Sequence, residues 1–303
     1  MLKLSVVIPT YNRIETLRFV IPALIAQTAD RASFEVVVAD SQSNDGTADY
    51  LAQVAREHAN VRHVPGPYTG RAMARNAGIA AAGGEIVLFT DADIIASEDL
   101  IERHLAHHES GRSVAVVGME LQVSSHDDYV QQKNDRERRR PLHPPKRKRL
   151  SWLYFLTGNA SARKADLDRV GRFDESFTGY GHEDLELGYR LQRAGIPIVY
   201  EPQAVNFHWH PVPYAEQKGR MELAGRSTVR FYRKHPAFSV MANLGMTPVS
   251  TGLHGVLARL PAVRERLDRY AATEGGAGLH RLARQIVYQY HYLSGVKAAL
   301  RDE

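Results

Sequence analysis

Short apolar runs alternate with segments of helical periodicity along the first ninety residues, and this alternation restricts the fold more than any other feature. Strands are expected at 4–8, 34–39, 61–64 and 85–90, and helices at 15–27, around 50–54 and at 70–82. Such an order predicts an α/β fold with a mainly parallel sheet flanked by helices. The loops after the strands then meet at one edge of the sheet, where proteins of this class bind ligands.

The last of these strands runs into Asp91-Ala92-Asp93. In an extended chain Asp91 and Asp93 would point to the same side, about 6 to 7 Å apart. Carboxylate oxygens are preferred ligands of Mg²⁺ and Mn²⁺, which often complete their coordination with substrate phosphates. The pair is therefore a candidate metal–diphosphate site, although aspartate is also common in any loop after a strand.

Composition limits the class of protein further. The 303 residues are 44% hydrophobic, which is enough for a core, and the absence of cysteine excludes disulfides and thiolate metal sites. A net charge of +5 favours anionic ligands or surfaces. The N-terminal apolar run stops at Pro9, and no stretch of eighteen apolar residues occurs. We expect a cytoplasmic protein, either free or peripheral at the inner face of the membrane.

Five strings in this order resemble family 2 glycosyltransferases of the GT-A fold. They are Ser5-Val6-Val7-Ile8-Pro9-Thr10-Tyr11-Asn12, the loop 40–47, Arg75-Asn76-Ala77-Gly78, Asp91-Ala92-Asp93 and the segment 181–191. The resemblance covers roughly residues 3 to 210. It implies a nucleotide-sugar donor, Mn²⁺ or Mg²⁺ as cofactor and, usually, inversion at the anomeric carbon, but it leaves the sugar and the acceptor open.

The resemblance also implies which residues hold the nucleotide. Pro9, Thr10 and Tyr11 would line the base, and Asp40 would accept a hydrogen bond from its edge. These contacts suit uracil best, hence a UDP-sugar. The family often has two successive aspartates at this loop, whereas here Ser41 follows Asp40, which leaves the identity of the base open.

Two arginines of the Ala-rich helix at 70–82 could reach the diphosphate through charge-assisted hydrogen bonds. They are Arg71 and Arg75. One of them is expected to be only solvated, and we favour Arg71 as the one that faces the ligand.

The Asp-x-Asp string supplies the implied metal ligands. By the resemblance, Asp91 contacts the ribose or the metal, Ala92 lies at the nucleotide sugar, and Asp93 ligates the cation. The third protein ligand is His208, with His210 as the alternative because both lie on the same side of an extended segment.

Glu183 and Asp184 open a helix at 185–193. A carboxylate at a helix N-terminus is stabilised in its charged form by the helix dipole. By the resemblance, Asp184 is the general base that takes the proton of the acceptor hydroxyl, and Glu183 positions the acceptor or the loop. The alternative is that both residues only cap the helix.

The expected domain scheme has a catalytic domain at 1–212 and a helical extension at 213–303. Within the catalytic domain a nucleotide-sugar half at 1–125 and an acceptor half at 151–212 flank a basic loop at 126–150. The blocks of like charge at 133–149, broken by prolines, are usually solvated. Alternatives for this loop are a cover over the donor site and a contact with anionic lipid.

The extension is expected to contain helices at 214–235, 253–271 and 279–300, each with an apolar and a basic face. It could pack on its own domain, form an oligomer or rest on a membrane. Processive members of the family carry Gln-x-x-Arg-Trp beside membrane spans. Here Met221 follows Arg220 and no span is present, so we expect transfer of one sugar per encounter.

By the resemblance, the expected function is that of a metal-dependent glycosyltransferase that inverts the anomeric carbon, as is usual in the family. Its acceptor would be a hydroxyl of a glycan, a lipid-linked glycan or a small molecule. No nucleic-acid partner is expected. One alternative is a non-catalytic polybasic protein that binds membrane or nucleic acid on a degenerate core. The other is a nucleotidyltransferase, which would need a Gly-rich loop after the first strand, where this chain has Pro9-Thr10-Tyr11-Asn12.

Overall fold

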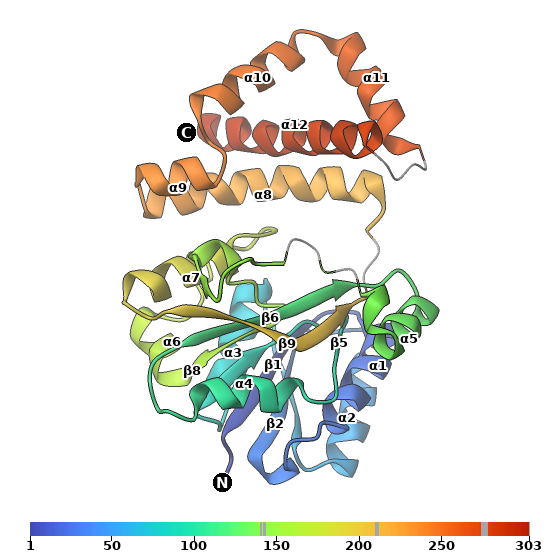
Figure 1. The fold of residues 1–303 in the computed structure, drawn as a ribbon, viewed down its shortest axis with the longest axis vertical. Helices are drawn as coiled ribbons and strands as arrows, with labels where there is room; N and C mark the ends of the chain where they lie inside the picture. The colour runs from blue at the N-terminus through green and yellow to red at the C-terminus, as the bar shows by residue number, and fades with distance from the viewer. Residues whose placement is uncertain (140, 142–143, 210–211, 274–277, 303) are drawn as a thin grey trace. The chain divides into compact units, whose positions relative to one another are not determined.

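The computed structural model describes residues 1–139, 141, 144–209, 212–273 and 278–302 (Figure 1). They form two compact units. The first comprises residues 1–178 and 183–211 and contains the sheet, and the second comprises 179–182 and 212–303 and is helical.

The N-terminal part of the first unit alternates strands and helices, as the sequence predicted. Its elements are β1 (Leu4–Thr10), α1 (Ile14–Ile25), a 3₁₀ turn (Arg31–Ser33), β2 (Phe34–Asp40), α2 (Thr47–Glu57), β3 (Val61–Pro65), α3 (Arg71–Ala81) and β4 (Ile86–Phe89). Strands β3, β2, β1 and β4 are adjacent and parallel, with Thr10 opposite Asp40 and Asp40 opposite Pro65. These strands therefore end at one edge of the sheet, and the expected α/β class is confirmed.

The second part of the unit adds antiparallel pairs, so the whole sheet is mixed. Its elements are β5 (Ile94–Ala96), α4 (Leu100–His108), β6 (Ala115–Gln122), α5 (His126–Asn134), β7 (Arg149–Leu150), β8 (Ala160–Arg163), α6 (Lys164–Val170), α7 (Glu183–Arg193) and β9 (Ile198–His208), with 3₁₀ turns at Arg136–Arg138 and Trp152–Tyr154. The strand order is β3-β2-β1-β4-β8-β6-β9-β5, and β7 also pairs with β9. Only β6 and β9 are parallel in this part.

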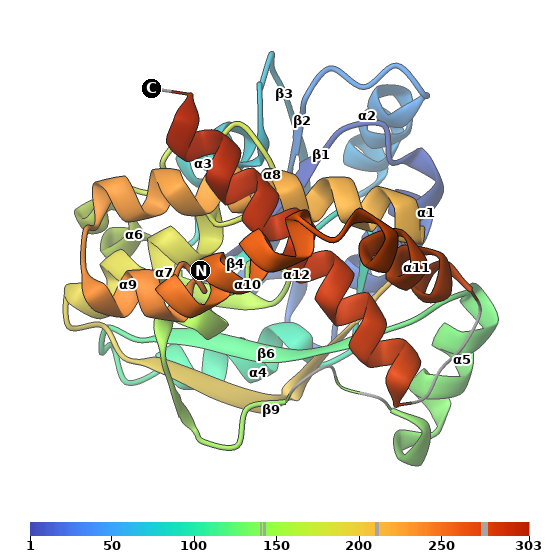
Figure 2. The same ribbon diagram turned by 90° about the horizontal axis from the view of Figure 1, so that it is seen from above.

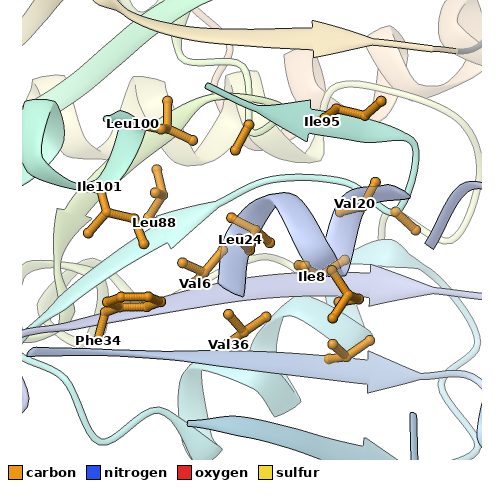
Figure 3. Packing of buried hydrophobic residues seen from close by; sticks show 14 of the residues in the cluster. Val6, Ile8, Val20, Leu24, Phe34, Val36, Leu88, Ile95, Leu100 and Ile101 are labelled. Atoms are coloured by element: carbon orange, nitrogen blue, oxygen red, sulfur yellow. The ribbon is translucent and has the colours of Figure 1, made fainter. Parts of the chain in front are cut away.

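The main core lies between the sheet and helices α1 and α4. Figure 3 shows Val6 and Ile8 of β1 and Leu88 of β4 packed against Val20 and Leu24 of α1. All five side chains are fully buried. Burial of this size fixes the strands, because each such side chain contributes about 1.5 to 3 kcal/mol when it leaves water. The loops at the edge of the sheet thus start from rigid positions.

A bulge interrupts the pairing of β6 with β9. Gly118 lies opposite Glu201, but the next residue, Met119, lies opposite Val205, so three residues of β9 have no partner. The amide nitrogen of Asn159 fills this irregularity by donating to the carbonyls of Met119 and Ala204. The bulge is therefore held by hydrogen bonds and not by a loose loop.

The basic segment at 126–150 is largely folded where the structure describes it, and the expectation of a loop throughout is wrong. Helix α5 begins there because the hydroxyl of Ser125 caps it by accepting from the backbone of Asp128. Arg139 lies over the ring of Phe207, and β7 pairs with β9. Residues 140 and 142–143 lie outside the described ranges.

The helical unit contains α8 (Tyr214–Lys234), α9 (Phe238–Asn243), α10 (Pro248–Ala258), α11 (Pro261–Ala272) and α12 (Leu279–Arg301). The expected helices at 214–235 and 279–300 are present. The single helix expected at 253–271 is wrong, because Pro261 cannot continue a helix and instead starts α11. No helix in the described ranges is long and apolar enough to cross a membrane.

Helices α8 and α12 cross closely at two glycines. A Cβ added to Gly225 would meet the carbonyl of Tyr292, and one added to Gly295 would meet the carbonyl of Glu222. Figure 1 shows α12 between α8 and the pair α10 and α11, so the unit has layers of its own.

Candidate active site

The loops after β1 and β2 are fastened to each other by side-chain caps. Ser43 accepts from the backbone of Asn12 at 2.8 Å, and Asn12 accepts from the backbone of Asn44 at 2.9 Å. Asp45 accepts from Ile14 at 3.0 Å and from Thr47 at 3.1 Å, so it connects the first residues of α1 and α2. The N-cap position of α2 belongs to Gly46.

Asp40 lies at the base of these two hydrogen-bonded loops with 1% of its surface exposed. One carboxylate oxygen accepts from Ser43 at 2.6 Å, and the other lies 3.3 Å from the ring of His63. Oδ1 already accepts two hydrogen bonds, from the backbone and the hydroxyl of Ser43, whereas Oδ2 has only His63 beside it. Oδ2 thus keeps a lone pair for another donor, and the expected contact with a nucleotide base stays a prediction.

Tyr11 and Thr10 offer more to a ligand at the same edge. The ring of Tyr11 is 59% exposed, and the buried hydroxyl of Thr10 has no hydrogen-bond partner. Pro9, the residue before them, is buried within β1. The roles that the sequence assigned to these three residues stay predictions.

The Asp91-Ala92-Asp93 string forms a turn between β4 and β5, and not the extended segment that the sequence predicted. The backbone of Ile94 donates to the carbonyl of Asp91 at 3.1 Å, which closes the turn. Asp91 and Asp93 are consequently held by different partners. The premise that two residues of one strand must point to the same side does not apply here, because β4 ends at Phe89.

Arg75 joins two of the site carboxylates. Its guanidinium is 2% exposed and donates to Asp91 at 2.8 Å and to Glu183 at 2.9 Å. The three residues come from α3, the turn after β4 and the first residue of α7. One buried cation therefore connects the donor half of the unit with the acceptor half.

The preference for Arg71 as the arginine that faces the ligand stays a prediction. Arg75 is the buried arginine with specific carboxylate partners, whereas Arg71 is exposed. Burial alone would raise the pKa of Asp91, but the charges of Arg75 and Arg71 outweigh it and lower that pKa. Both arginines thus act on Asp91. A diphosphate contact by either of them stays a prediction.

His208, the last residue of β9, lies between the carboxylates of Asp93 and Glu120. Its Nε2 lies 3.6 Å from Oδ1 of Asp93, and its Nδ1 lies 3.1 Å from Oε1 of Glu120. Burial opposes the charged imidazole, but Glu120, Asp93 and Asp91 raise the pKa of His208 above its usual value. The candidate His210 lies outside the described residues.

The fit of a cation to these residues can be tested on their geometry. Two ligands at about 2.1 Å from one ion lie at most about 4.2 Å apart, so the separation of 3.6 Å between Asp93 and His208 is compatible with a shared Mg²⁺ or Mn²⁺. Among the described residues no group of three or more His, Asp or Glu side chains forms a metal site. The chain thus supplies two converging donors, with Asp91 held nearby by Arg75.

Asp184 lies in the first turn of α7, next to the Arg75 cluster. Its Oδ1 accepts from the backbone of Leu185 at 2.7 Å. Burial and the adjacent charge of Glu183 raise the pKa of Asp184 to about 7, against the opposing charge of Arg75. The expectation that the helix dipole would keep this carboxylate charged is corrected, because burial outweighs it. Asp184 can both accept and release a proton near neutral pH.

Glu120 is the residue of this site that the sequence did not predict. It lies two residues before Gln122 on β6, and that polar alternation after the buried run 115–118 was the available signal. Its other oxygen lies against Gly158, where a Cβ would collide with it. The string Gly158-Asn159 therefore has two structural tasks, since Gly158 leaves room for Glu120 and Asn159 holds the bulge.

Two family models match the chain. The model for glycosyl transferase family 2 matches residues 5–171, which is more than half of the chain. The model described as the N-terminal domain of galactosyltransferase matches residues 141–208.

Validoxylamine A glucosyltransferase from Streptomyces hygroscopicus subsp. jinggangensis is 30% identical over 301 residues, which cover 90% of this chain and 69% of the relative. The chain covers 64% of the enzyme of the same name from subsp. limoneus.

Among solved structures, the mannosyltransferase PcManGT from Pyrobaculum calidifontis with GDP-Man and Mn²⁺ has a TM-score of 0.67 at 21% identity, over 99% of this chain and 88% of that one. S. aureus TarS 1–349 with UDP has a TM-score of 0.56 at 19% identity, over 100% and 92%. These likenesses concern the fold.

The ion pairs of Arg75 generate a stability prediction. Arg75→Ala removes the buried cation that Asp91 and Glu183 share, so the free energy of unfolding should fall by about 3 to 5 kcal/mol. Arg71→Ala, on the exposed face of the same helix, is the control and should change it by less than about 0.5 kcal/mol. Urea unfolding followed by circular dichroism measures both, and equal effects of the two variants would contradict the central role of Arg75.

Proposed function

This chain belongs to glycosyltransferase family 2 and has its GT-A fold, and we propose that it transfers a sugar from UDP to an acceptor hydroxyl, with inversion and with the help of Mn²⁺ or Mg²⁺. That it is a glycosyltransferase with a nucleotide-sugar donor follows from the family. The observation that carries the finer proposal is the convergence of Arg75, Asp91 and Glu183, with Asp184 beside them, at one edge of the sheet.

The donor would lie over the loops after β1 and β2, which are joined by hydrogen bonds of Asn12, Ser43 and Asp45. The exposed ring of Tyr11 offers a surface for the base, and the free hydroxyl of Thr10 offers a hydrogen bond. UDP in the TarS structure supports a uridine donor, while GDP-Man in PcManGT shows that a similar fold also takes guanosine. The hydrogen bonds between the two loops would hold this surface in its binding conformation before the donor binds.

A divalent cation would be held by Asp93 and His208, with Asp91 close to it. When bound, such an ion neutralises the negative charge that develops on the departing diphosphate. Both PcManGT and GalNAc-T7 were solved with Mn²⁺, which supports the choice of metal. The chain itself fixes the orientation of the His208 ring, because Glu120 contacts Nδ1, the ring nitrogen that does not face Asp93.

Glu120 would hold one tautomer of His208. Its Oε1 accepts from Nε2 of Gln122 at 2.9 Å and lies 3.1 Å from Nδ1 of His208. The amide nitrogen of Gln122 also lies 3.1 Å from Nδ1 of His208, but the carboxylate favours a proton on Nδ1. The lone pair of the imidazole Nε2 then points toward Asp93. We therefore include Glu120 as a positioning residue for the metal ligand.

Asp184 would take the proton of the acceptor hydroxyl while that oxygen attacks the anomeric carbon. The bond from oxygen to carbon forms as the bond from carbon to diphosphate breaks. A base with a pKa near the working pH is suited to this step, since it is charged in a useful fraction of molecules and still binds the proton. Glu183 raises that pKa from the adjacent position.

The acceptor remains the broadest part of the proposal. The relative from Streptomyces hygroscopicus subsp. jinggangensis is named a validoxylamine A glucosyltransferase, which supports a small-molecule acceptor for this chain. A glycan or a lipid-linked glycan is an alternative acceptor for this chain. The nucleotidyltransferase alternative and the degenerate core are set aside by family membership.

The first experiment is calorimetric titration with UDP, GDP, ADP and thymidine diphosphate, each with Mn²⁺ and with EDTA. We expect UDP to bind with Mn²⁺ only. Asp93→Ala should lose this binding, whereas Asp184→Asn should keep it and release UDP from UDP-sugars about 10²- to 10⁴-fold more slowly.

Asp49→Asn, on the exposed part of α2, is the matched control for both variants. Tight binding of GDP instead of UDP would overturn the choice of base. Wild-type turnover in Asp184→Asn would overturn the assignment of the base residue.

The raised pKa of Asp184 predicts the pH dependence of turnover. Only the charged carboxylate accepts a proton, so kcat/KM should rise with pH through a midpoint of about 7. Glu183→Gln removes the neighbouring negative charge but keeps an oxygen for Arg75, so the midpoint should move to lower pH. Exposed Glu57→Gln is the control, and an unchanged or higher midpoint in Glu183→Gln would contradict this coupling.

The tautomer argument predicts a graded effect on metal binding. Glu120→Ala should weaken Mn²⁺ binding in the presence of UDP by about 10- to 100-fold. Glu120→Gln keeps an acceptor oxygen and should recover most of it. Electron paramagnetic resonance of free Mn²⁺ measures this without turnover, with exposed Glu102→Ala as control. Equal losses in both Glu120 variants would indicate that charge, and not orientation, is what His208 requires.

A further inference from the structure

Helix α10 exposes a continuous apolar stripe. Val249, Leu253, Val256 and Leu260 are 81%, 59%, 52% and 45% exposed. The three that lie on α10, Val249, Leu253 and Val256, fall within an arc of roughly 60° at about 100° per residue, and Leu260 follows the end of this helix at Ala258. Helix α11 adds Val263, which is 47% exposed. We name these five residues the outer apolar face.

This face lies in the outer layer of the helical unit. Within that unit α12 separates α10 and α11 from α8, as Figures 1 and 2 show. Scattered exposed leucines are ordinary, but three exposed apolar side chains on one side of α10, followed closely in the chain by Leu260 and Val263, mark an interaction surface. The face is also continuous with a groove of about 500 Å³ between α10 and α12, because Leu253 lines both.

The charge around the face is positive. Arg259, Arg266 and Arg269 are exposed on the same segment together with one exposed acidic residue, Glu265, whereas Asp268 is engaged by Lys218 and Tyr214. Residues 212–303 carry fourteen Lys and Arg against seven Asp and Glu, a net charge of +7, although the whole chain carries only +5. The positive charge of the protein is therefore concentrated in the helical unit.

An apolar stripe flanked by arginines is the pattern of helices that lie in the interface of a bilayer. We propose that α10 and α11 dock on a membrane surface that contains anionic lipids, with the outer apolar face inserted between the headgroups and the arginines beside the lipid phosphates. The groove beside Leu253 gives room for one acyl chain.

Charge distinguishes this occupant from the two others that could cover the face. A second copy of the chain would bring two positively charged surfaces together, which opposes association. Nucleic acid would neutralise the arginines but would leave the apolar stripe without apolar partners. Anionic lipid satisfies both features of the face. This inference does not depend on the identity of the donor or of the base residue.

Vesicle co-sedimentation tests the proposal. The probes are vesicles of phosphatidylcholine alone and of three parts phosphatidylcholine to one part phosphatidylglycerol. We expect binding to the mixed vesicles only, and weaker binding at high salt. The variant Val249→Ser/Leu253→Ser/Val256→Ser should lose binding by at least about tenfold.

Leu300→Ser is the matched control, because Leu300 is 51% exposed on α12 and lies outside the outer apolar face. Arg259→Glu/Arg266→Glu tests the charge without touching an apolar side chain, and it should lose binding as well. Circular dichroism and urea unfolding show that each variant is folded. Failure of the wild type to bind mixed vesicles would overturn the proposal, as would a dimer in solution that the triple-serine variant dissociates.

Discussion

The site depends on one buried cation between carboxylates that come from distant parts of the sequence. Arg75, Asp91 and Glu183 lie on α3, on the turn after β4 and on α7, and no backbone pairing joins these three segments directly. Removal of charges from water is costly, so the arrangement is stable only while all partners are present. The donor and acceptor halves are consequently fixed to each other by electrostatics, and the pKa of the neighbouring Asp184 is set by the same cluster.

Much of the fold could be predicted because its signals are local. The strands that precede the site loops are apolar runs in the sequence. Because parallel strands end at one edge of a sheet, the sequence predicted that Thr10, Asp40 and Asp91 lie near one another. The prediction that Asp91 to Asp93 are extended was wrong, because their conformation depends on residues distant in sequence. Whether Asp91 continues a strand or turns depends on β5 and its partner β9, which lies more than a hundred residues away.

Side-chain environments were the least predictable part. Arg71 and Arg75 look alike in an Ala-rich helix, and only the approach of α7 decides that Arg75 is the buried one. The same approach buries Asp184, so a rule about helix ends gave the wrong direction for its pKa. Glu120 carries no motif of its own, because its importance comes from His208 on a different strand.

The three unpaired residues in β9 change the alternation of its side chains relative to β6. Ile198 and Phe207 lie opposite Ala115 and Leu121, which are six positions apart along β6, whereas Ile198 and Phe207 are nine positions apart along β9. In an uninterrupted strand they would point to opposite faces, and His208 would share the side of Ile198. The bulge thus reverses the alternation of the later residues of β9 relative to β6. A deletion of one residue there would leave the later sequence of β9 unchanged and yet move each of its later side chains to the opposite face of the sheet.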